Sequence, residues 1–164
     1  MSTTYDIGTL AQLRDGELPF DKVHAMMSGF KDSDRFEKML QLWQDSVTWS
    51  DPIIMPLSEH LFIVRKPDGK RVIKSKWGYE YCEAHQNWKL FAKVFVRDTP
   101  ELINEIYPDK MGCDTDWMHL REYYDPETGV LLEVEAVPPG YPIVHDFKPD
   151  IDTFYREWLG KAPP

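Results

Sequence analysis

The chain of 164 residues has only two cysteines, Cys82 and Cys113, and no apolar run long enough to span a bilayer. Its first residues also show no secretory signal pattern. Two cysteines that share no motif, in a chain without such a signal, indicate reduced thiols rather than a disulfide framework. We therefore expect a cytoplasmic protein without a membrane partner.

Catalytic signatures are equally scarce. The nine glycines are scattered, so no glycine-rich loop is available to cradle phosphates, and no Gly-x-Ser-x-Gly elbow occurs. The five histidines share no motif, and His145-Asp146 is a single pair in a predicted loop. We therefore expect no catalytic and no cofactor-binding residue on this chain. A small enzyme that uses His145 and Asp146 is kept as a third hypothesis.

Basic residues are outnumbered, since 19 lysines and arginines stand against 28 aspartates and glutamates and leave a net charge of −9. This balance argues against nucleic acid or an anionic membrane as the main partner. Residues 51–100 hold nine basic and six acidic side chains, whereas residues 101–164 hold five and fourteen. The basic middle and the acidic end either attract one another within the fold or face different neighbours.

The length predicts a single domain, because a chain of this size buries roughly 70% of the surface that it exposes when unfolded. Residues 1–50 form a helical layer of three short helices, the clearest of which begins at Asp34, with Glu37 completing a capping box. Residues 51–137 form a β-hairpin region with one helix, and residues 138–164 form an extended arm and a terminal helix. The predicted fold class is α+β.

The middle region is predicted to contain two antiparallel hairpins and an extra strand. The expected strands are residues 61–66, 71–76, 88–96, 118–124 and 130–137. Pro67-Asp68-Gly69-Lys70 joins the first pair, because Asp-Gly tolerates the positive φ of a tight turn. Residues 125–129 join the last pair, and Thr99-Pro100-Glu101 begins the helix between the hairpins.

The arm after the last strand contains three prolines, which lack N–H donors and cannot continue a ladder. A short helix follows, capped by Asp150 or Asp152, with an aromatic face. Either the arm and helix pack on the core of this chain, or they dock onto something larger, because buried aromatic side chains dominate interface energetics. The predicted partner interface consists of Pro138, Pro139, Gly140, Tyr141, Pro142, Tyr155 and Trp158.

Cys82-x-x-His85 is the one spacing that could bind a metal, as half of a tetrahedral zinc site. The other half would come from the second hairpin tip, where Asp125 and Glu127 offer hard oxygen ligands instead of thiolates. We therefore predict no metal on this chain. The alternative function is a free-standing metal-binding or regulatory module that uses Cys82 and His85 with Asp125 and Glu127.

Several segments, taken in order, resemble the small (gamma) subunit of acetone carboxylase. They are residues 27–36, 87–90, 96–99, 105–108, 131–136 and 142–160. The resemblance extends over nearly the whole chain, and its specificity lies in the joint order of these segments. The related small subunit of acetophenone carboxylase is a neighbouring possibility.

The resemblance implies a heteromeric, ATP-dependent ketone carboxylase, a ligase that forms a carbon–carbon bond. In that family, acetone, bicarbonate and ATP give acetoacetate, AMP and phosphate. Two larger hydantoinase-like subunits, of alpha and beta type, would carry the chemistry with ATP and a divalent metal, manganese or magnesium. The small subunit would be a non-catalytic assembly component.

Relatives often carry a Cys-x-Cys-Gly-His pattern and a Cys-x-x-Cys pair, as a zinc ribbon would. Here those positions read Ser75, Trp77 and Tyr79, then Asp125 and Thr128. The resemblance thus implies two hairpins in a zinc-ribbon-like arrangement that lacks its cysteine ligands. We expect Trp77, Tyr79 and neighbouring aromatic side chains to fill that space by apolar packing.

Overall fold

The computed structural model describes residues 4–30, 32–108 and 110–164. Its helices are α1 (Ile7–Arg14), α2 (Phe20–Ser28), α3 (Arg35–Asp45), α4 (Pro100–Asn104) and α5 (Ile151–Thr153), with a 3₁₀ turn η1 (Trp88–Phe91) and a π-helical turn η2 (Phe154–Trp158). Its strands are β1 (Ile53–Pro56), β2 (Leu61–Arg65), β3 (Arg71–Ser75), β4 (Glu80–Glu83), β5 (Lys93–Arg97), β6 (His119–Tyr124) and β7 (Leu131–Val137). The predicted α+β class is confirmed.

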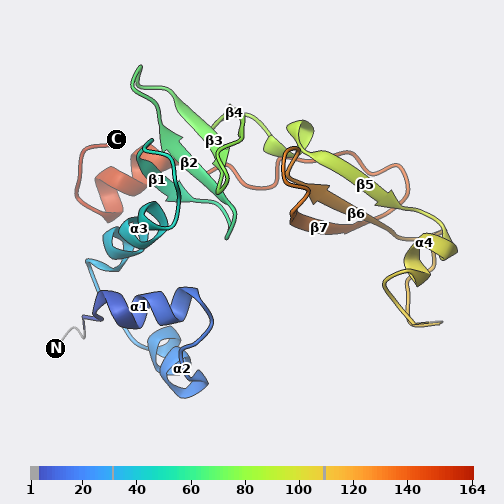
Figure 1. Ribbon diagram of the computed structural model, residues 1–164, viewed down its shortest axis with the longest axis horizontal. Helices are drawn as coiled ribbons and strands as arrows, with labels where there is room; N and C mark the ends of the chain where they lie inside the picture. Colours follow the sequence, from blue (N-terminus) through green and yellow to red (C-terminus); the bar gives the residue numbers. More distant parts are fainter. Residues whose placement is uncertain (1–3, 31, 109) are drawn as a thin grey trace.

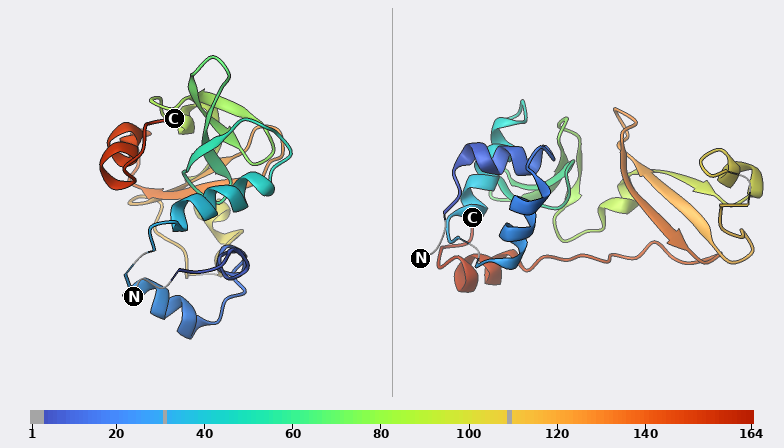
Figure 2. Two further views of the ribbon diagram at one scale, coloured as in Figure 1. Left: turned by 90° about the vertical axis from the view of Figure 1, so that its left-hand side faces the viewer. Right: turned by 90° about the horizontal axis from the view of Figure 1, so that it is seen from below.

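The strands form two separate antiparallel sheets, in the orders β1-β2-β3-β4 and β5-β6-β7. Figure 1 shows the sheets side by side along the long axis of the molecule, with α1–α3 and the C-terminal helix, formed by α5 and η2, beside the first sheet and α4 at the far end of the second. The chain passes from the first sheet to the second through η1. It returns along the extended segment 138–149 (Figure 2).

Local sequence signals account for the helical layer. Asp6 caps α1 by accepting a hydrogen bond from the Thr9 N–H at 2.9 Å. The capping box predicted for α3 is wrong, because Asp34 makes no side-chain cap bond and its carboxylate instead pairs with Lys38 Nζ at 2.7 Å. The three helices are joined by a cluster of buried side chains, Leu10, Leu18, Met26 and Leu42.

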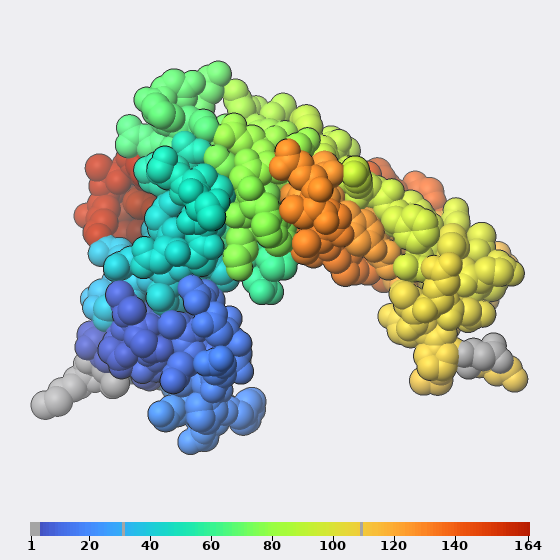
Figure 3. Space-filling view, in the orientation of Figure 1, coloured from blue at the N-terminus to red at the C-terminus, as the bar shows by residue number. Residues whose placement is uncertain are grey.

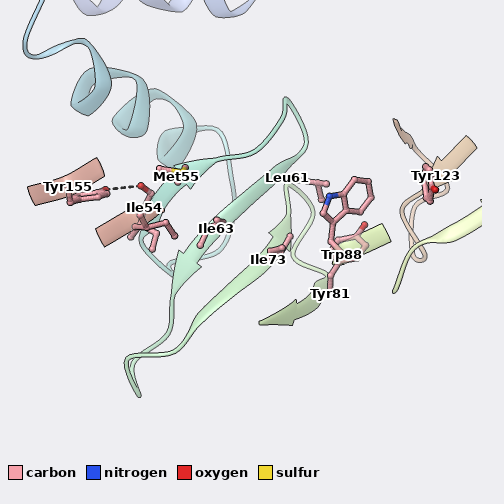
Figure 4. Packing of buried hydrophobic residues seen from close by; sticks show 10 residues of the cluster. Ile54, Met55, Leu61, Ile63, Ile73, Tyr81, Trp88, Tyr123 and Tyr155 are labelled. Atoms are coloured by element: carbon pink, nitrogen blue, oxygen red, sulfur yellow. Dashed lines mark hydrogen bonds between the residues drawn. The ribbon is translucent and has the colours of Figure 1, made fainter. Parts of the chain in front are cut away.

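The main core covers one face of the first sheet (Figure 4). Its buried members are Ile54, Met55, Leu61, Ile63, Ile73, Tyr81, Trp88, Tyr123, Ile151 and Tyr155. On the opposite face Phe62 packs against Trp43 of α3, with ring centroids 5.4 Å apart. Because β2 is covered on both faces, its apolar residues run continuously instead of alternating. The core extends to the second sheet through Trp88 and Tyr123, whose centroids lie 5.9 Å apart.

Both predicted hairpins are present, as β2–β3 and β6–β7. The strand expected at 88–96 is partly wrong, because residues 88–91 form η1 and the strand covers Lys93–Arg97. The first hairpin is flanked by β1 and β4, whereas the second gains only β5, which pairs with β6, and each hairpin lies in its own sheet. The zinc-ribbon-like arrangement is not confirmed. Within the described ranges, no helix has the length and apolar composition to cross a membrane.

Candidate partner-binding surface

The proline-rich arm begins where β7 ends. Tyr141 N–H donates to the Pro138 carbonyl at 3.1 Å, which closes a tight turn over Pro139-Gly140. Gly140 has a φ of +74°, which favours glycine at the third place of such a turn. All five residues from Pro138 to Pro142 are exposed. The arm therefore presents its predicted interface residues to solvent.

Two buried cations of the second sheet region hold the arm in place. Arg121 Nη2 donates to the Tyr141 carbonyl at 2.6 Å, and Lys89 Nζ donates to Asp146 at 3.1 Å. Both bonds reach across to the arm from elements far away in the sequence. Since the arm is ordered before any partner arrives, docking would cost little conformational entropy.

Lys89 makes the densest set of charge contacts in this region. Its side chain is 1% exposed, and Nζ lies 2.6 Å from Glu133, 2.6 Å from Glu135 and 3.1 Å from Asp146. The ammonium also lies 5.5 Å from the centroid of the Tyr123 ring. In the described part of the chain, these three carboxylates are the one group of potential ligands close enough to hold a metal ion, and the Lys89 ammonium already pairs with all three.

The pKa values in this cluster follow from competing effects. Burial of Lys89 opposes its charge, but hydrogen bonds to Glu133, Glu135 and Asp146 outweigh that cost and raise the pKa of Lys89. Burial likewise acts to raise the pKa of Glu135, yet its hydrogen bonds from Lys89 and Tyr123 lower that pKa below its ordinary value. Lys89 and Glu135 therefore both stay ionised at neutral pH.

The C-terminal helix separates its two predicted anchor residues. Asp150 caps it by accepting from the Thr153 N–H at 3.0 Å. Tyr155 is buried in the core, and its hydroxyl donates to the Ile54 carbonyl at 2.7 Å (Figure 4). Trp158 is 79% exposed. Tyr155 thus packs within this chain, as one of the two alternatives predicts, and Trp158 remains available to a partner.

The candidate metal ligands are not brought together. Cys82 Sγ lies 3.8 Å from the Gln86 carbonyl, and burial raises the pKa of this thiol to about 11, so it is protonated at neutral pH. The His85 side chain is exposed and lies beside Glu83. Asp125 is fully buried and accepts from the Tyr81 hydroxyl at 2.7 Å. Among the described residues, none of these side chains belongs to a group of three or more potential ligands.

The positions that carry cysteines in a zinc ribbon do not fit zinc here. Ser75 Oγ accepts from the Tyr79 N–H at 3.1 Å, and both Asp125 oxygens accept hydrogen bonds from protein groups. Tyr79 packs edge-on against Tyr81 with ring centroids 4.9 Å apart. Trp77 does not fill that space as expected, because its ring is partly exposed and lies against His60.

His145 and Asp146, which the third hypothesis treats as a catalytic pair, are not arranged as one. The Asp146 carboxylate pairs with Lys89, and no hydrogen bond joins it to His145 among the described residues. Burial, followed by the charge of Lys148, lowers the pKa of His145. A histidine that no carboxylate orients is poorly placed for acid–base work.

Sequence reasoning missed the contacts of Lys89 and Arg121. A signal for them was present, because Glu133 and Glu135 lie on the same face of β7 and a partly buried acidic face requires cations. Which cations would satisfy it depends on contacts between residues 46 positions apart, and no local pattern encodes these.

Comparison with known proteins points to one family. The family model described as "Acetone carboxylase gamma subunit" matches residues 47–159, which hold both sheets and the C-terminal helix. The chain is 43% identical over 161 residues to the acetone carboxylase gamma subunit of Xanthobacter autotrophicus, a match that covers 98% of this chain and 96% of that protein. It is 30% identical over 78 residues to the acetophenone carboxylase beta subunit of Aromatoleum aromaticum, covering 46% and 60% respectively. The chain therefore belongs to the acetone carboxylase gamma subunit family.

Proposed function

We propose that this chain is a small, non-catalytic assembly subunit of a heteromeric, ATP-dependent ketone carboxylase in the cytoplasm. The reaction of the whole complex would be the carboxylation of acetone by bicarbonate and ATP, giving acetoacetate, AMP and phosphate. The observation that carries the proposal is the nearly full-length similarity to a protein named as one subunit of acetone carboxylase.

The partners would be two larger hydantoinase-like subunits, of alpha and beta type, which would hold ATP and a divalent metal, manganese or magnesium. This chain would hold no cofactor of its own. The buried charges described above support this division of labour, because Lys89 and Arg121 are used to fasten the arm and Asp125 to join the two sheets. These side chains are engaged in contacts within the chain.

The contact surface would be the proline-rich part of the arm, Pro138–Pro142, together with Trp158. An arm held by hydrogen bonds to its own body loses little freedom on binding, and a large exposed aromatic side chain is the usual central anchor of an interface. Substrate selection would then belong to the larger chains.

The test is coexpression of this chain, carrying an affinity tag, with both large acetone carboxylase subunits from the same organism. We expect both to copurify with it, and we expect acetoacetate to form only when acetone, bicarbonate, ATP and all three chains are present. The control is the tagged chain alone, which should neither turn over acetone nor bind ATP in isothermal titration. Turnover or tight nucleotide binding by the isolated chain would contradict the proposal.

A further inference from the structure

The molecule has the shape of an arch with two feet (Figure 3). The two sheets form the span. The N-terminal foot, residues 4–30, contains α1 and α2, and the far foot, residues 98–108 and 110–118, contains α4 and the segment that follows it. Figures 1 and 3 show both feet projecting on the same side of the span.

The N-terminal foot carries apolar side chains that the described chain leaves uncovered. Phe20 and Met27 of α2 are 79% and 75% exposed, and Phe30 just beyond the helix is 97% exposed. Met26, on the other face of α2, is buried against the helical cluster. Phe20 and Met27 stand seven residues apart, the spacing at which a helix presents anchors to a groove.

The far foot also carries exposed apolar side chains. Met111 and Trp117 are 71% and 76% exposed. The segment packs closely against α4, because Ile103 of that helix is buried and a side chain at Gly112 would collide with it. Trp117 is held in a turn, since its N–H donates to the Asp114 carbonyl at 3.1 Å. Trp117 is therefore presented on a fixed backbone.

Size argues that the two feet act together. A large aromatic side chain buries roughly 150–250 Å², and a standard interface takes about 800 Å² from each partner. Even if each methionine buried as much as a ring, the three anchors of the N-terminal foot or the two of the far foot would fall short of that area. The two feet together approach it.

Charge indicates the partner. Residues 4–30 hold four acidic and two basic side chains, and the described residues of the far foot hold five acidic and one basic. Both feet thus carry a net negative charge, 2 − 4 = −2 for the N-terminal foot and 1 − 5 = −4 for the far foot. A second copy of this chain, with its net charge of −9, would meet like charge, whereas apolar pockets with basic rims would be complementary.

We propose that the two feet dock at the same time onto the large-subunit part of the carboxylase, at two apolar pockets with basic rims. This inference rests on the function proposed above and adds a bivalent mode of attachment apart from the arm. Because the span fixes the feet relative to one another, the second contact forms within an already bound complex. Linked contacts of this kind raise affinity about 10²–10⁴-fold over one contact alone.

The test measures the dissociation constant between the full-length chain and large acetone carboxylase subunits purified without it, by biolayer interferometry. One variant changes the N-terminal foot (Phe20→Ser, Met27→Ser, Phe30→Ser) and another changes the far foot (Met111→Ser, Trp117→Ser). We expect each to weaken binding at least about 10²-fold, because either change removes the linked contact. The control, Leu90→Ser, removes a side chain that is 63% exposed on η1 within the span, and should bind as the wild type does.

Wild-type affinity in either foot variant would overturn the two-footed attachment while leaving the assembly function standing. An equal loss in Leu90→Ser would also overturn it. If the wild-type chain itself failed to bind the large subunits, the proposed function would fall together with it. Melting temperatures verify folding, and the single changes Phe30→Ser and Trp117→Ser replace any combined variant that does not fold.

Discussion

At the scale of single residues, buried polar groups join parts of this chain that are distant in sequence. Asp125 lies at the tip of the β6–β7 hairpin and accepts from Tyr81 of β4 at 2.7 Å and from the Thr128 N–H at 2.9 Å. Burial acts to raise the pKa of Asp125, but these hydrogen bonds prevail and lower it. The Tyr81–Asp125 bond therefore ties the first sheet to the second.

Tyr81→Phe should destabilise the fold while keeping the ring in place. It removes one donor from a buried, ionised carboxylate, which costs about 1–3 kcal/mol of the free energy of unfolding. Urea denaturation at neutral pH measures the change. Tyr79→Phe is the control, because the Tyr79 hydroxyl has no hydrogen bond among the residues described. Equal losses in both variants would contradict the assignment.

Lys89→Met should destabilise more strongly, because it removes the cation that pairs with Glu133, Glu135 and Asp146 and leaves Glu135 only the more distant Arg121 guanidinium, 3.9 Å away. Removing one partner of a buried ion pair costs about 3–5 kcal/mol. Thermal and urea unfolding report the loss. Lys93→Met, at an exposed position of β5, is the matched control and should unfold as the wild type does.

The same cluster predicts the pH dependence of stability. The pKa of Glu135 is lower in the folded chain than its unfolded value near 4.3. Its contribution is therefore present above that value and is lost as the pH falls through the folded pKa. In Lys89→Met the carboxylates repel one another, so their protonation favours folding. Between about pH 5 and pH 3, the free energy of unfolding should fall in the wild type, and the deficit of the variant should shrink; a constant deficit would exclude this account.

At the scale of elements, the C-terminal helix divides its aromatic side chains between two tasks. Tyr155 packs against Phe36 of α3 with ring centroids 6.1 Å apart and bonds to β1. Trp158 makes its ring contact with Phe154 of the same helix and is otherwise exposed. The helix thereby closes the core with one face and leaves the other free.

Tyr155→Ala and Trp158→Ala should therefore differ in kind. Loss of the buried Tyr155 ring costs about 3–5 kcal/mol of folding free energy, whereas Trp158→Ala should leave the melting temperature nearly unchanged. If Trp158 is a central anchor, its loss weakens assembly with the large subunits by about 2 kcal/mol or more. Copurification and titration of the complex measure this, and a full-strength complex with Trp158→Ala would remove that residue from the interface.

At the scale of the whole molecule, shape and charge act together. The arch places two acidic feet on one side of the span (Figure 3), and the chain as a whole carries a net charge of −9. A basic partner surface would attract such a molecule before contact, and this attraction raises the association rate more than the affinity.

The association rate with the large subunits should therefore fall by roughly tenfold or more between low and high salt, because added ions screen the attraction. Stopped-flow or interferometry measurements over a salt series give this dependence. Replacing Asp114 and Asp116 by Asn removes two negative charges from the far foot and should make the dependence shallower. A rate that does not change with salt would contradict the proposed charge complementarity.

Local sequence alone determined the hairpins β2–β3 and β6–β7 and the start of α4, and it narrowed the cap of the C-terminal helix to Asp150 or Asp152, because turn and capping preferences act over three or four residues. The ordered series of segments likewise led to the family. Only the tertiary structure decided which strands join each hairpin, that Lys89 pairs with three carboxylates, and that Tyr155 is buried while Trp158 is exposed. These outcomes depend on contacts between residues tens of positions apart, and short-range sequence patterns do not specify which distant residues make such contacts.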